Sequence, residues 1–237
     1  MNPSLPSADL LKLQAVWLAD ARHRILRNAE IGRRKRILDL GAGYGLISTE
    51  LRRRCDGTVI AMDRSLQALS SFFADVPVLC ADAGMLPFAN RSFDFVFSQN
   101  VLMWTGRVEQ VLREVARILE ADGTWALLEP DYGGMMEYPH EIETRDLWIQ
   151  ALHRAGADPV IGRKLPAMLA AAGWMIRVEL LPRLMTPRAS RFDLLDELPL
   201  TEDERRAVSE IRAISEEIGA ARQVAHLPYF LVIADRS

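Results

Sequence analysis

The sequence contains few cysteines, only Cys55 and Cys80 among 237 residues. Two thiols are too few for the disulfide framework of a small secreted domain, and a chain of this length can bury a large core without one. Cys80 follows Val78 and Leu79, so we expect its side chain to pack in the interior. No spacing of His, Asp and Glu resembles a ligand set, and we therefore predict no metal site.

Long apolar runs are also missing. No stretch approaches the roughly 18 consecutive apolar residues that a membrane span needs. In the first 30 residues, charged side chains interrupt the apolar ones, and no apolar block leads to a small-residue cleavage site, so the layout of a signal peptide is absent. These absences predict a cytoplasmic protein.

Positive charge is not in excess, because the formal net charge is −3 and the pI is about 5.9. Surfaces that bind nucleic acid usually carry a basic excess, so a nucleic acid is not the expected partner. The basic runs Arg33–Arg36 and Arg52–Arg54 are short and are better explained as solvated helix ends. No Pro/Gly/Ser-rich linker divides the chain, which predicts a single domain over residues 1–237 of undetermined oligomeric state.

The first half of the sequence alternates short apolar runs with amphipathic segments. Residues 8–29 are predicted to form one amphipathic helix. The predicted strands after it are 37–40, 58–62, 78–81, 93–98 and 124–128, and the predicted helices are 46–51, 66–73 and 108–119. Strands that alternate with helices imply βαβ units, so we expect an α/β, Rossmann-like, mostly parallel sheet with helices on both faces.

Beyond residue 130 the pattern is less regular. Helices are predicted near 141–155 and 165–172, and strands over 174–181 and 229–234. Thr201 and Glu204 form a capping box for a further helix. We assign residues 1–32 to an N-terminal helical lid and 33–130 to a cofactor-binding half. Residues 131–237 form the expected substrate half, with a helical insertion at about 182–221 that completes the lid.

The most informative segment is Asp39–Gly45, with the sequence DLGAGYG. Glycines between a buried strand and a helix allow a tight turn and let a ligand lie close to the backbone. Asp63 ends the second predicted strand, 22 residues after Gly41, where a carboxylate can accept hydrogen bonds from both hydroxyls of a ribose. Asp82 ends the third predicted strand, where it can accept from the exocyclic amine of an adenine.

The glycine spacing distinguishes between nucleotide ligands. A dinucleotide-binding turn reads Gly-x-Gly-x-x-Gly, but position 46 is Leu here and the third glycine, Gly45, comes one residue early. The spacing resembles an adenosylmethionine turn, in which an acidic residue stands two positions before the first glycine, as Asp39 does. A nicotinamide-dependent oxidoreductase is thus a rival interpretation that the early glycine and Asp82 disfavour.

Together these motifs resemble the class I S-adenosylmethionine-dependent methyltransferases, specifically the methyltransferase type 11 group that includes the ubiquinone/menaquinone C-methyltransferases. The matching segments are 37–45, 59–65, 81–88, 92–104 and, less strongly, 126–130. The resemblance implies a seven-stranded sheet whose last strand, 229–234, runs antiparallel. One matching position, Asp94, is interpreted as structural.

By this resemblance the cofactor is S-adenosyl-L-methionine. Asp39 would hold its amino-acid end. The backbone of Gly41, Ala42 and Gly43 would contact the same end, and Asp63 would bind the ribose.

The same resemblance gives roles to residues at the ends of the third and fourth strands. Arg64 would lie against the adenine ring. Asp82 and Ala83 would recognise the adenine amine, and Gln99 and Asn100 would lie beside the sulfonium.

Methyl transfer is an in-line displacement, for which the protein aligns the nucleophile with the methyl group and excludes water. A general base is useful only when the acceptor must lose a proton. Glu129 and His140, beyond the fifth strand, are the candidate catalytic residues. Each has a structural alternative, since Glu129 could accept from loop N–H groups and His140 could be a surface residue.

The aromatic side chains Trp17, Trp104, Tyr132 and Tyr138 are candidates for an acceptor pocket, although ordinary core packing is the alternative at each position. They favour a small-molecule acceptor that is largely apolar or aromatic. A protein that binds S-adenosylmethionine but has other chemistry, or a scaffold role, is the main alternative, because fold alone does not assign function.

Overall fold

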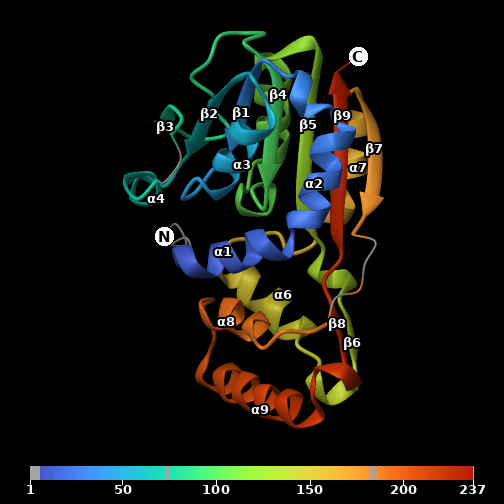
Figure 1. Ribbon diagram of the computed structural model, residues 1–237. Helices are drawn as coiled ribbons and strands as arrows, with labels where there is room; N and C mark the ends of the chain where they lie inside the picture. Colours follow the sequence, from blue (N-terminus) through green and yellow to red (C-terminus); the bar gives the residue numbers. More distant parts are fainter. Residues whose placement is uncertain (1–5, 73–74, 182–183, 185, 237) are drawn as a thin grey trace.

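The computed structural model describes residues 6–72, 75–181, 184 and 186–236. Its main sheet has seven strands in the order β3–β2–β1–β4–β5–β9–β7 (Figure 1). The strands are β1 (Arg36–Leu40), β2 (Thr58–Asp63), β3 (Val78–Cys80), β4 (Phe93–Gln99), β5 (Leu119–Pro130), β7 (Trp174–Leu180) and β9 (Tyr229–Arg236). Strands β1 to β5 pair in parallel, and β9 is antiparallel to both β5 and β7. The expected fold class and the antiparallel last strand are confirmed.

Helices cover both faces of this sheet and its lower edge in Figure 1. They are α1 (Ala8–Trp17), α2 (Ala19–Asn28), α3 (Leu46–Arg54), α4 (Leu66–Ser70), α5 (Val108–Ile118), α6 (Arg145–Arg154), α7 (Ile161–Ala171), α8 (Ser190–Asp196) and α9 (Glu202–Ile218). The short 3-10 turns are η1 (Ile31–Arg33), η2 (Leu102–Trp104), η3 (Tyr132–Gly134), η4 (His140–Ile142) and η5 (Ala220–Arg222). Strands β6 (Met136–Tyr138) and β8 (Val224–His226) form a small antiparallel sheet.

The alternation of side chains along each strand divides the core into two layers. In β4, Phe95 and Phe97 pack with helices α2 and α3 on one face, whereas Val96 packs on the other face with α5 and α7. Both layers are buried, so the strands read as apolar runs in the sequence, as is usual for a parallel sheet covered on both sides. Asp94 at the start of β4 accepts hydrogen bonds from the backbone nitrogens of Lys35 and Arg36 (2.7 and 2.9 Å), which confirms its structural role.

The carboxyl ends of the parallel strands point toward a second group of elements (Figure 1). Helix α1 lies next to this edge, and α6, α8, α9 and the β6–β8 sheet lie beyond it. The capping box of α9 is confirmed, because Thr201 Oγ1 accepts from the Glu204 nitrogen and Glu204 Oε2 accepts from the Thr201 nitrogen. The division into lid, cofactor half and substrate half stays a prediction; its insertion includes residues 182, 183 and 185, which lie outside the described residues.

Several sequence-based boundaries were wrong. The predicted helix 8–29 is two helices, because the chain turns at the fully buried Leu18, and α2 has a buried face against the sheet whereas α1 has no buried residue. Helix α5 ends at Ile118 and β5 begins at Leu119, so the fifth strand starts before the predicted 124–128. Cys80 is exposed because β3 is an edge strand. The predicted helix 66–73 is the shorter α4, and Phe73 lies outside the described residues.

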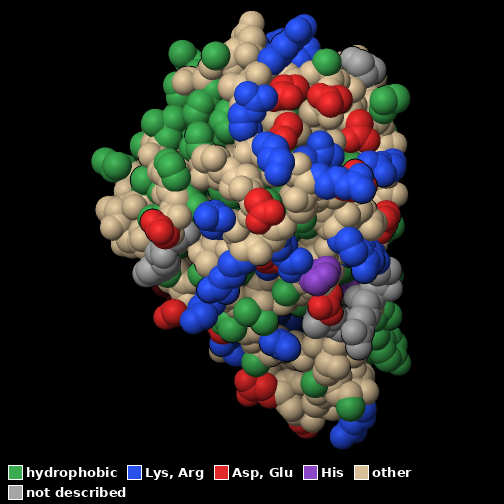
Figure 2. All heavy atoms as spheres, turned by 45° about the horizontal axis from the view of Figure 1, so that its top comes forward, with side chains coloured by type: hydrophobic (Ala, Val, Ile, Leu, Met, Phe, Trp, Pro, Cys, Tyr) green, Lys and Arg blue, Asp and Glu red, His purple; other side chains and the backbone are tan. Residues whose placement is uncertain are grey.

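Basic and acidic side chains are interspersed on the face that Figure 2 presents. Two ion pairs near the amino ends of the parallel strands, Arg36–Glu120 and Arg177–Asp235, illustrate this mixture. In the part of the chain that the structure describes, no helix is long and apolar enough to cross a membrane. The same residues contain no group of three His, Cys, Asp or Glu side chains arranged to hold a metal ion.

Candidate active site

The glycine turn between β1 and α3 has the left-handed backbone that its sequence predicts. Gly41, Gly43 and Gly45 have φ angles of +77°, +53° and +84°, a region that L side chains rarely adopt. A Cβ on Gly41 would lie 2.3 Å from Val101 Cγ2, whereas a Cβ on Gly43 would meet only Leu11 Cδ1, at 4.0 Å. Gly41 is therefore required for packing, and the turn is open to a ligand at Gly43.

Asp63, at the end of β2, fixes this turn. Its Oδ2 accepts a hydrogen bond from the Gly43 nitrogen and its Oδ1 accepts one from the Ser65 nitrogen, both at 2.8 Å. A carboxylate oxygen can accept a further hydrogen bond beyond these. Asp63 therefore connects the β2 end to the open part of the glycine turn and still has acceptor capacity for a ligand.

Asp39, near the end of β1, is a buried carboxyl group on the face of the sheet that α2 and α3 cover. Ser48 Oγ of α3 donates to Asp39 Oδ2 at 2.5 Å. Burial raises the pKa of Asp39 to about 7, with a smaller contribution from the negative charge of Asp63, while the Ser48 hydrogen bond and the Arg22 charge act in the opposite direction. A cationic ligand group beside Asp39 would favour its ionised form.

A pH dependence of stability follows from this pKa. The pKa of an Asp in an unfolded chain is about 3.9. Between that value and about 7, Asp39 keeps its proton in the folded protein but loses it in the unfolded chain. The free energy of unfolding therefore falls as the pH rises from about 4 to about 7. Asp39→Asn removes this loss, and we expect it to raise the free energy of unfolding at pH 8 relative to pH 5 by about 2–4 kcal/mol compared with the unmodified protein.

Urea unfolding at pH 5 and pH 8 measures the difference. Ser48→Ala is a matched variant, because it removes the hydrogen bond that lowers the Asp39 pKa and should make the decline with pH steeper. Equal pH dependence in Asp39→Asn and the unmodified protein would show that Asp39 is ionised over this whole range.

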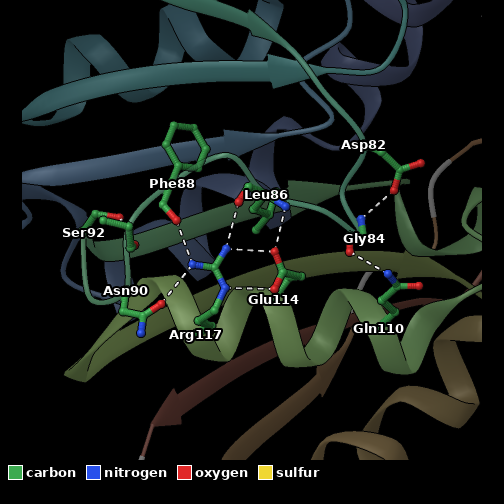
Figure 3. A network of polar contacts seen from close by, with 10 residues as sticks. Asp82, Gly84, Leu86, Phe88, Asn90, Ser92, Gln110, Glu114 and Arg117 are labelled. Atoms are coloured by element: carbon green, nitrogen blue, oxygen red, sulfur yellow. Dashed lines mark hydrogen bonds and ion pairs between the residues drawn. The ribbon is translucent and has the colours of Figure 1, made fainter.

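Asp82 follows β3 in a loop held by helix α5 (Figure 3). Its Oδ1 accepts from the Gly84 nitrogen at 2.7 Å, and its Oδ2 pairs with Arg107 at 3.2 Å. Glu114 and Arg117 of α5 bind the backbone of Leu86, through its nitrogen (2.7 Å) and its carbonyl oxygen (2.8 Å). The half-exposed Asp82 side chain thus stands on a firmly attached loop.

The other predicted cofactor-binding residues lie at the carboxyl edge of the sheet, but they do not all contact one another. Ala83 is partly buried next to Asp82, and Arg64 is exposed beyond the end of β2. Gln99 Oε1 accepts from Arg22 at 3.2 Å, and Asn100 Nδ2 donates to Gln14 of α1 at 2.7 Å. Asn100 has a left-handed backbone (φ +56°), and its buried Oδ1 has no hydrogen-bond partner among the described residues. The Tyr229 hydroxyl, which also lacks a satisfied hydrogen bond, is close enough to the Asn100 side chain to be its partner.

Arg22 of α2 is a site residue that the sequence analysis missed. It is buried, and its Nε donates to Glu50 at 2.6 Å. Its Nη1 and Nη2 donate to the Ala15 carbonyl oxygen at 3.1 Å, and Nη1 also reaches Gln99. The guanidinium therefore links both N-terminal helices to the end of β4, and its charge acts on Asp39.

Glu129, near the end of β5, is 0% exposed. Its Oε1 accepts from the backbone nitrogens of Val101 and Leu102, both at 2.8 Å, and its Oε2 accepts from that of Met103 at 3.4 Å. Burial raises the pKa of Glu129 to about 7, and these three hydrogen bonds partly oppose the shift. The contacts match the structural alternative, in which Glu129 holds the loop that packs against Gly41.

The other catalytic candidate, His140, lies on η4, which packs against α9, the helix far from the main sheet in Figure 1. Its side chain is 83% exposed and lies 3.2 Å from Glu141. This is the surface position that the alternative interpretation expected. A catalytic role for either candidate stays a prediction.

The four aromatic candidates do not form one cluster. Trp17 of α1 makes an edge-to-face contact with the buried Tyr229 (5.3 Å between centroids), and Tyr132 packs against Trp148 (5.0 Å). Trp104 is partly buried on η2, whereas Tyr138 on β6 is exposed. Burial raises the pKa of Tyr229, and its hydroxyl is close enough to Tyr132 and Glu129 to sense their charges. Trp17 and Tyr132 thus flank the end of the sheet, and a substrate-binding role for the four stays a prediction.

The seven-stranded Rossmann-like sheet has an antiparallel final strand and an acidic, glycine-rich turn at its carboxyl edge. These are the features by which the sequence resembles the class I S-adenosylmethionine-dependent methyltransferases. Residues 38–127 match the family model described as a methyltransferase domain. This match confirms the resemblance inferred from the sequence.

The similar curated proteins include several methyltransferases. The chain is 39% identical over 134 residues to the biotin biosynthesis bifunctional protein BioHC of Cellvibrio japonicus (55% of this chain, 25% of that protein). It is 28% identical to a malonyl-[acyl-carrier protein] O-methyltransferase of Legionella pneumophila (64% and 57%) and 36% identical to the demethylmenaquinone methyltransferase of Corynebacterium urealyticum (46% and 47%). The chain thus spans between a quarter and somewhat more than half of the length of these relatives.

Solved structures share the fold at low sequence identity. The YcgJ protein of Bacillus subtilis has a TM-score of 0.63 and 16% identity (91% of this chain, 98% of that one). Geranyl diphosphate C-methyltransferase of Streptomyces coelicolor, solved with S-adenosyl-L-homocysteine, has a TM-score of 0.60 and 15% identity (93% and 80%). The [4+2]-cyclase SpnF has a TM-score of 0.57 and 17% identity (91% and 80%). At these identities the likeness shows the fold alone.

Proposed function

We propose that this protein transfers a methyl group from S-adenosyl-L-methionine to a small-molecule acceptor. The observation that carries the proposal is the glycine turn fixed by Asp63. The Asp63 carboxylate binds the Gly43 nitrogen at 2.8 Å, at the point where the turn is open and beside the buried Asp39. The methyltransferase domain model matches the same part of the chain, residues 38–127.

The chemistry of the donor set fits this cofactor. Its amino-acid end carries an ammonium and a carboxylate group. Asp39 is an acceptor for the ammonium, and the buried Arg22 supplies positive charge for the carboxylate. We propose that Asp63 binds the ribose, that Arg64 lies against the adenine, and that Asp82 with Ala83 recognises its amine. The exposed side of Asp82 and its firmly held loop support this assignment.

When bound, S-adenosylmethionine supplies an electrophilic methyl group on its sulfonium. Gln99 and Asn100, at the end of β4, would orient that end of the cofactor. Helix α1 would exclude water, since Leu11 faces Gly43 and Trp17 contacts Tyr229. Glu129 would act as a positioning residue that holds Val101 against the turn. Alignment of the acceptor is then the main contribution of the protein to catalysis.

The acceptor is proposed to be a largely apolar or aromatic metabolite, on the basis of Trp17 and Tyr132 at the end of the sheet. A cytoplasmic location and the exclusion of nucleic acid as substrate stay predictions, because they depend on composition alone.

Calorimetric titration tests the cofactor assignment. We expect micromolar binding of both S-adenosylmethionine and S-adenosylhomocysteine, and no binding of NAD under the same conditions. Failure of both adenosyl ligands to bind would refute the assignment.

Mass spectrometry after incubation with quinones, phenols and amines then tests methyl transfer. A mass gain of one methyl group in any of these acceptors supports the proposal. Tight cofactor binding with no methylated product from any of these classes would favour the non-methylating alternative.

A further inference from the structure

Arg191 of α8 is buried with most of its hydrogen-bonding capacity unused. Its side chain is 17% exposed, and its Nη1 donates to Glu137 Oε1 at the long distance of 3.4 Å. Its Nε and Nη2 are buried and have no hydrogen-bond partner among the described residues. A buried donor without a partner destabilises the folded state, and a charged one does so more strongly, so this arrangement favours a ligand.

The partner carboxylate, Glu137 of β6, is engaged elsewhere. Its Oε2 accepts from the backbone nitrogens of Thr144 and Arg145 (2.7 and 3.0 Å), and its Oε1 accepts from Thr144 Oγ1 (2.7 Å). These bonds cap the start of α6. Glu137 would therefore keep three donors without Arg191, whereas Arg191 has only one weak contact with Glu137.

The unused atoms form one edge of the guanidinium group. Nε–H and one Nη–H of an arginine point in parallel, and this pair matches the two oxygens of a carboxylate or phosphate in a bidentate contact. The guanidinium carbon lies 4.5 Å from the centroid of the Phe192 ring, which helps to fix the orientation of the group. Burial lowers the pKa of Arg191, as expected for a cation that lacks a full counter-charge.

Helix α8 places the Nε and Nη2 edge of the Arg191 guanidinium on the same side of the sheet as the proposed active site. Helix α8 packs against α1 (Figure 1), and α1 carries Gln14 and Trp17, which contact the ends of β4 and β9. Phe192, next to Arg191, belongs to the same buried cluster as Tyr132 and Trp148. Arg191 thus stands on a helix that packs against α1, beyond the carboxyl edge of the main sheet.

We propose that Arg191 binds an oxyanion, a carboxylate or phosphate group, of the methyl acceptor. The acceptor then has an apolar body for the aromatic residues at the end of the sheet and an anionic group for the lid. This inference rests on the proposed function for the identity of the ligand, but oxyanion binding by Arg191 is measurable without methyl transfer.

The full chain saturated with S-adenosylhomocysteine is titrated with sodium acetate, sodium phosphate or sodium chloride at matched ionic strength, with arginine Nε–H signals followed by NMR. We expect a saturable shift, with acetate or phosphate but not chloride, of one signal that is missing in Arg191→Gln. The oxyanion with the stronger effect distinguishes a carboxylate from a phosphate acceptor. Arg188→Gln, which removes an exposed arginine three residues earlier, should retain the shift.

No shift with either oxyanion, or the same shift in Arg191→Gln, overturns the proposal.

A measurement of thermal stability distinguishes oxyanion binding from a purely structural role of Arg191. Arg191→Met should leave the Tm unchanged or raise it, because the variant removes a partly buried charge whose ion pair with Glu137 is long, and Glu137 keeps its other donors. A large fall in Tm would show that Arg191 serves the fold instead. Cofactor affinity should stay within twofold in Arg191→Gln. If the unmodified protein does not bind the cofactor, the proposed function fails, and the titration without S-adenosylhomocysteine still tests Arg191.

Discussion

Replacing Glu129 with alanine is expected to lower the free energy of unfolding by about 3–5 kcal/mol, because it removes the acceptor of buried donors. The nitrogens of Val101, Leu102 and Met103 all donate to this carboxylate, which has no exposed surface. Water has little access to replace it. Urea unfolding at pH 8 measures the change.

Two variants make this prediction specific. Glu129→Gln should lose only about 1 kcal/mol, because an amide oxygen at the Oε1 position still accepts from both Val101 and Leu102. Glu143→Ala, at an exposed position directly after η4, should change stability by less than about 0.5 kcal/mol. If the alanine and glutamine variants at position 129 were equally stable, the loop N–H groups would not depend on Glu129.

The same contacts connect stability to the site. Val101 receives its position from Glu129 and occupies the space where a side chain on Gly41 would stand. A loosened loop would therefore release the glycine turn as well. Asp39 and Glu129 are both buried carboxyl groups near strand ends with pKa values raised to about 7, so their burial makes this edge of the sheet less stable than a packed apolar core would be. Such a cost is typical of functional sites.

Local sequence signals predicted the part of the site that is local in the chain. The apolar runs of β1 and β4 mark buried strands, and the Gly41–Gly45 spacing marks the turn, because each depends on a few consecutive residues. Asp63 was placed correctly at the end of β2 for the same reason. The capping box of α9 is likewise a four-residue signal.

Contacts between distant segments were not predictable in this way. Arg22 occupies a position on the apolar stripe of α2, between Leu18 and Ile25, and this unusual placement was the one available signal of its role. Its partner Glu50 is 28 residues away. Arg191 and Glu137 are separated by 54 residues, and no pattern in either segment indicates that they meet. Tertiary packing also decided that the chain bends at Leu18 and that Cys80 lies on an edge strand.

Asp63→Ala is expected to weaken the binding of S-adenosylhomocysteine by about ten- to 150-fold, since hydrogen bonds to a charged group contribute about 1.5–3 kcal/mol. Asp56→Ala is the matched control, because Asp56 is an exposed aspartate just before the opposite end of β2, and its replacement should leave affinity unchanged.

Loss of affinity alone would not separate a ribose contact from the support that Asp63 gives to Gly43. A 2′-deoxyribose analogue of the ligand makes that separation. If Asp63 binds the ribose, the analogue should bind more weakly than the parent ligand to the unmodified protein, whereas the two should bind Asp63→Ala alike. An equal penalty for the missing hydroxyl in both proteins would place the ribose elsewhere and leave Asp63 with the glycine turn alone.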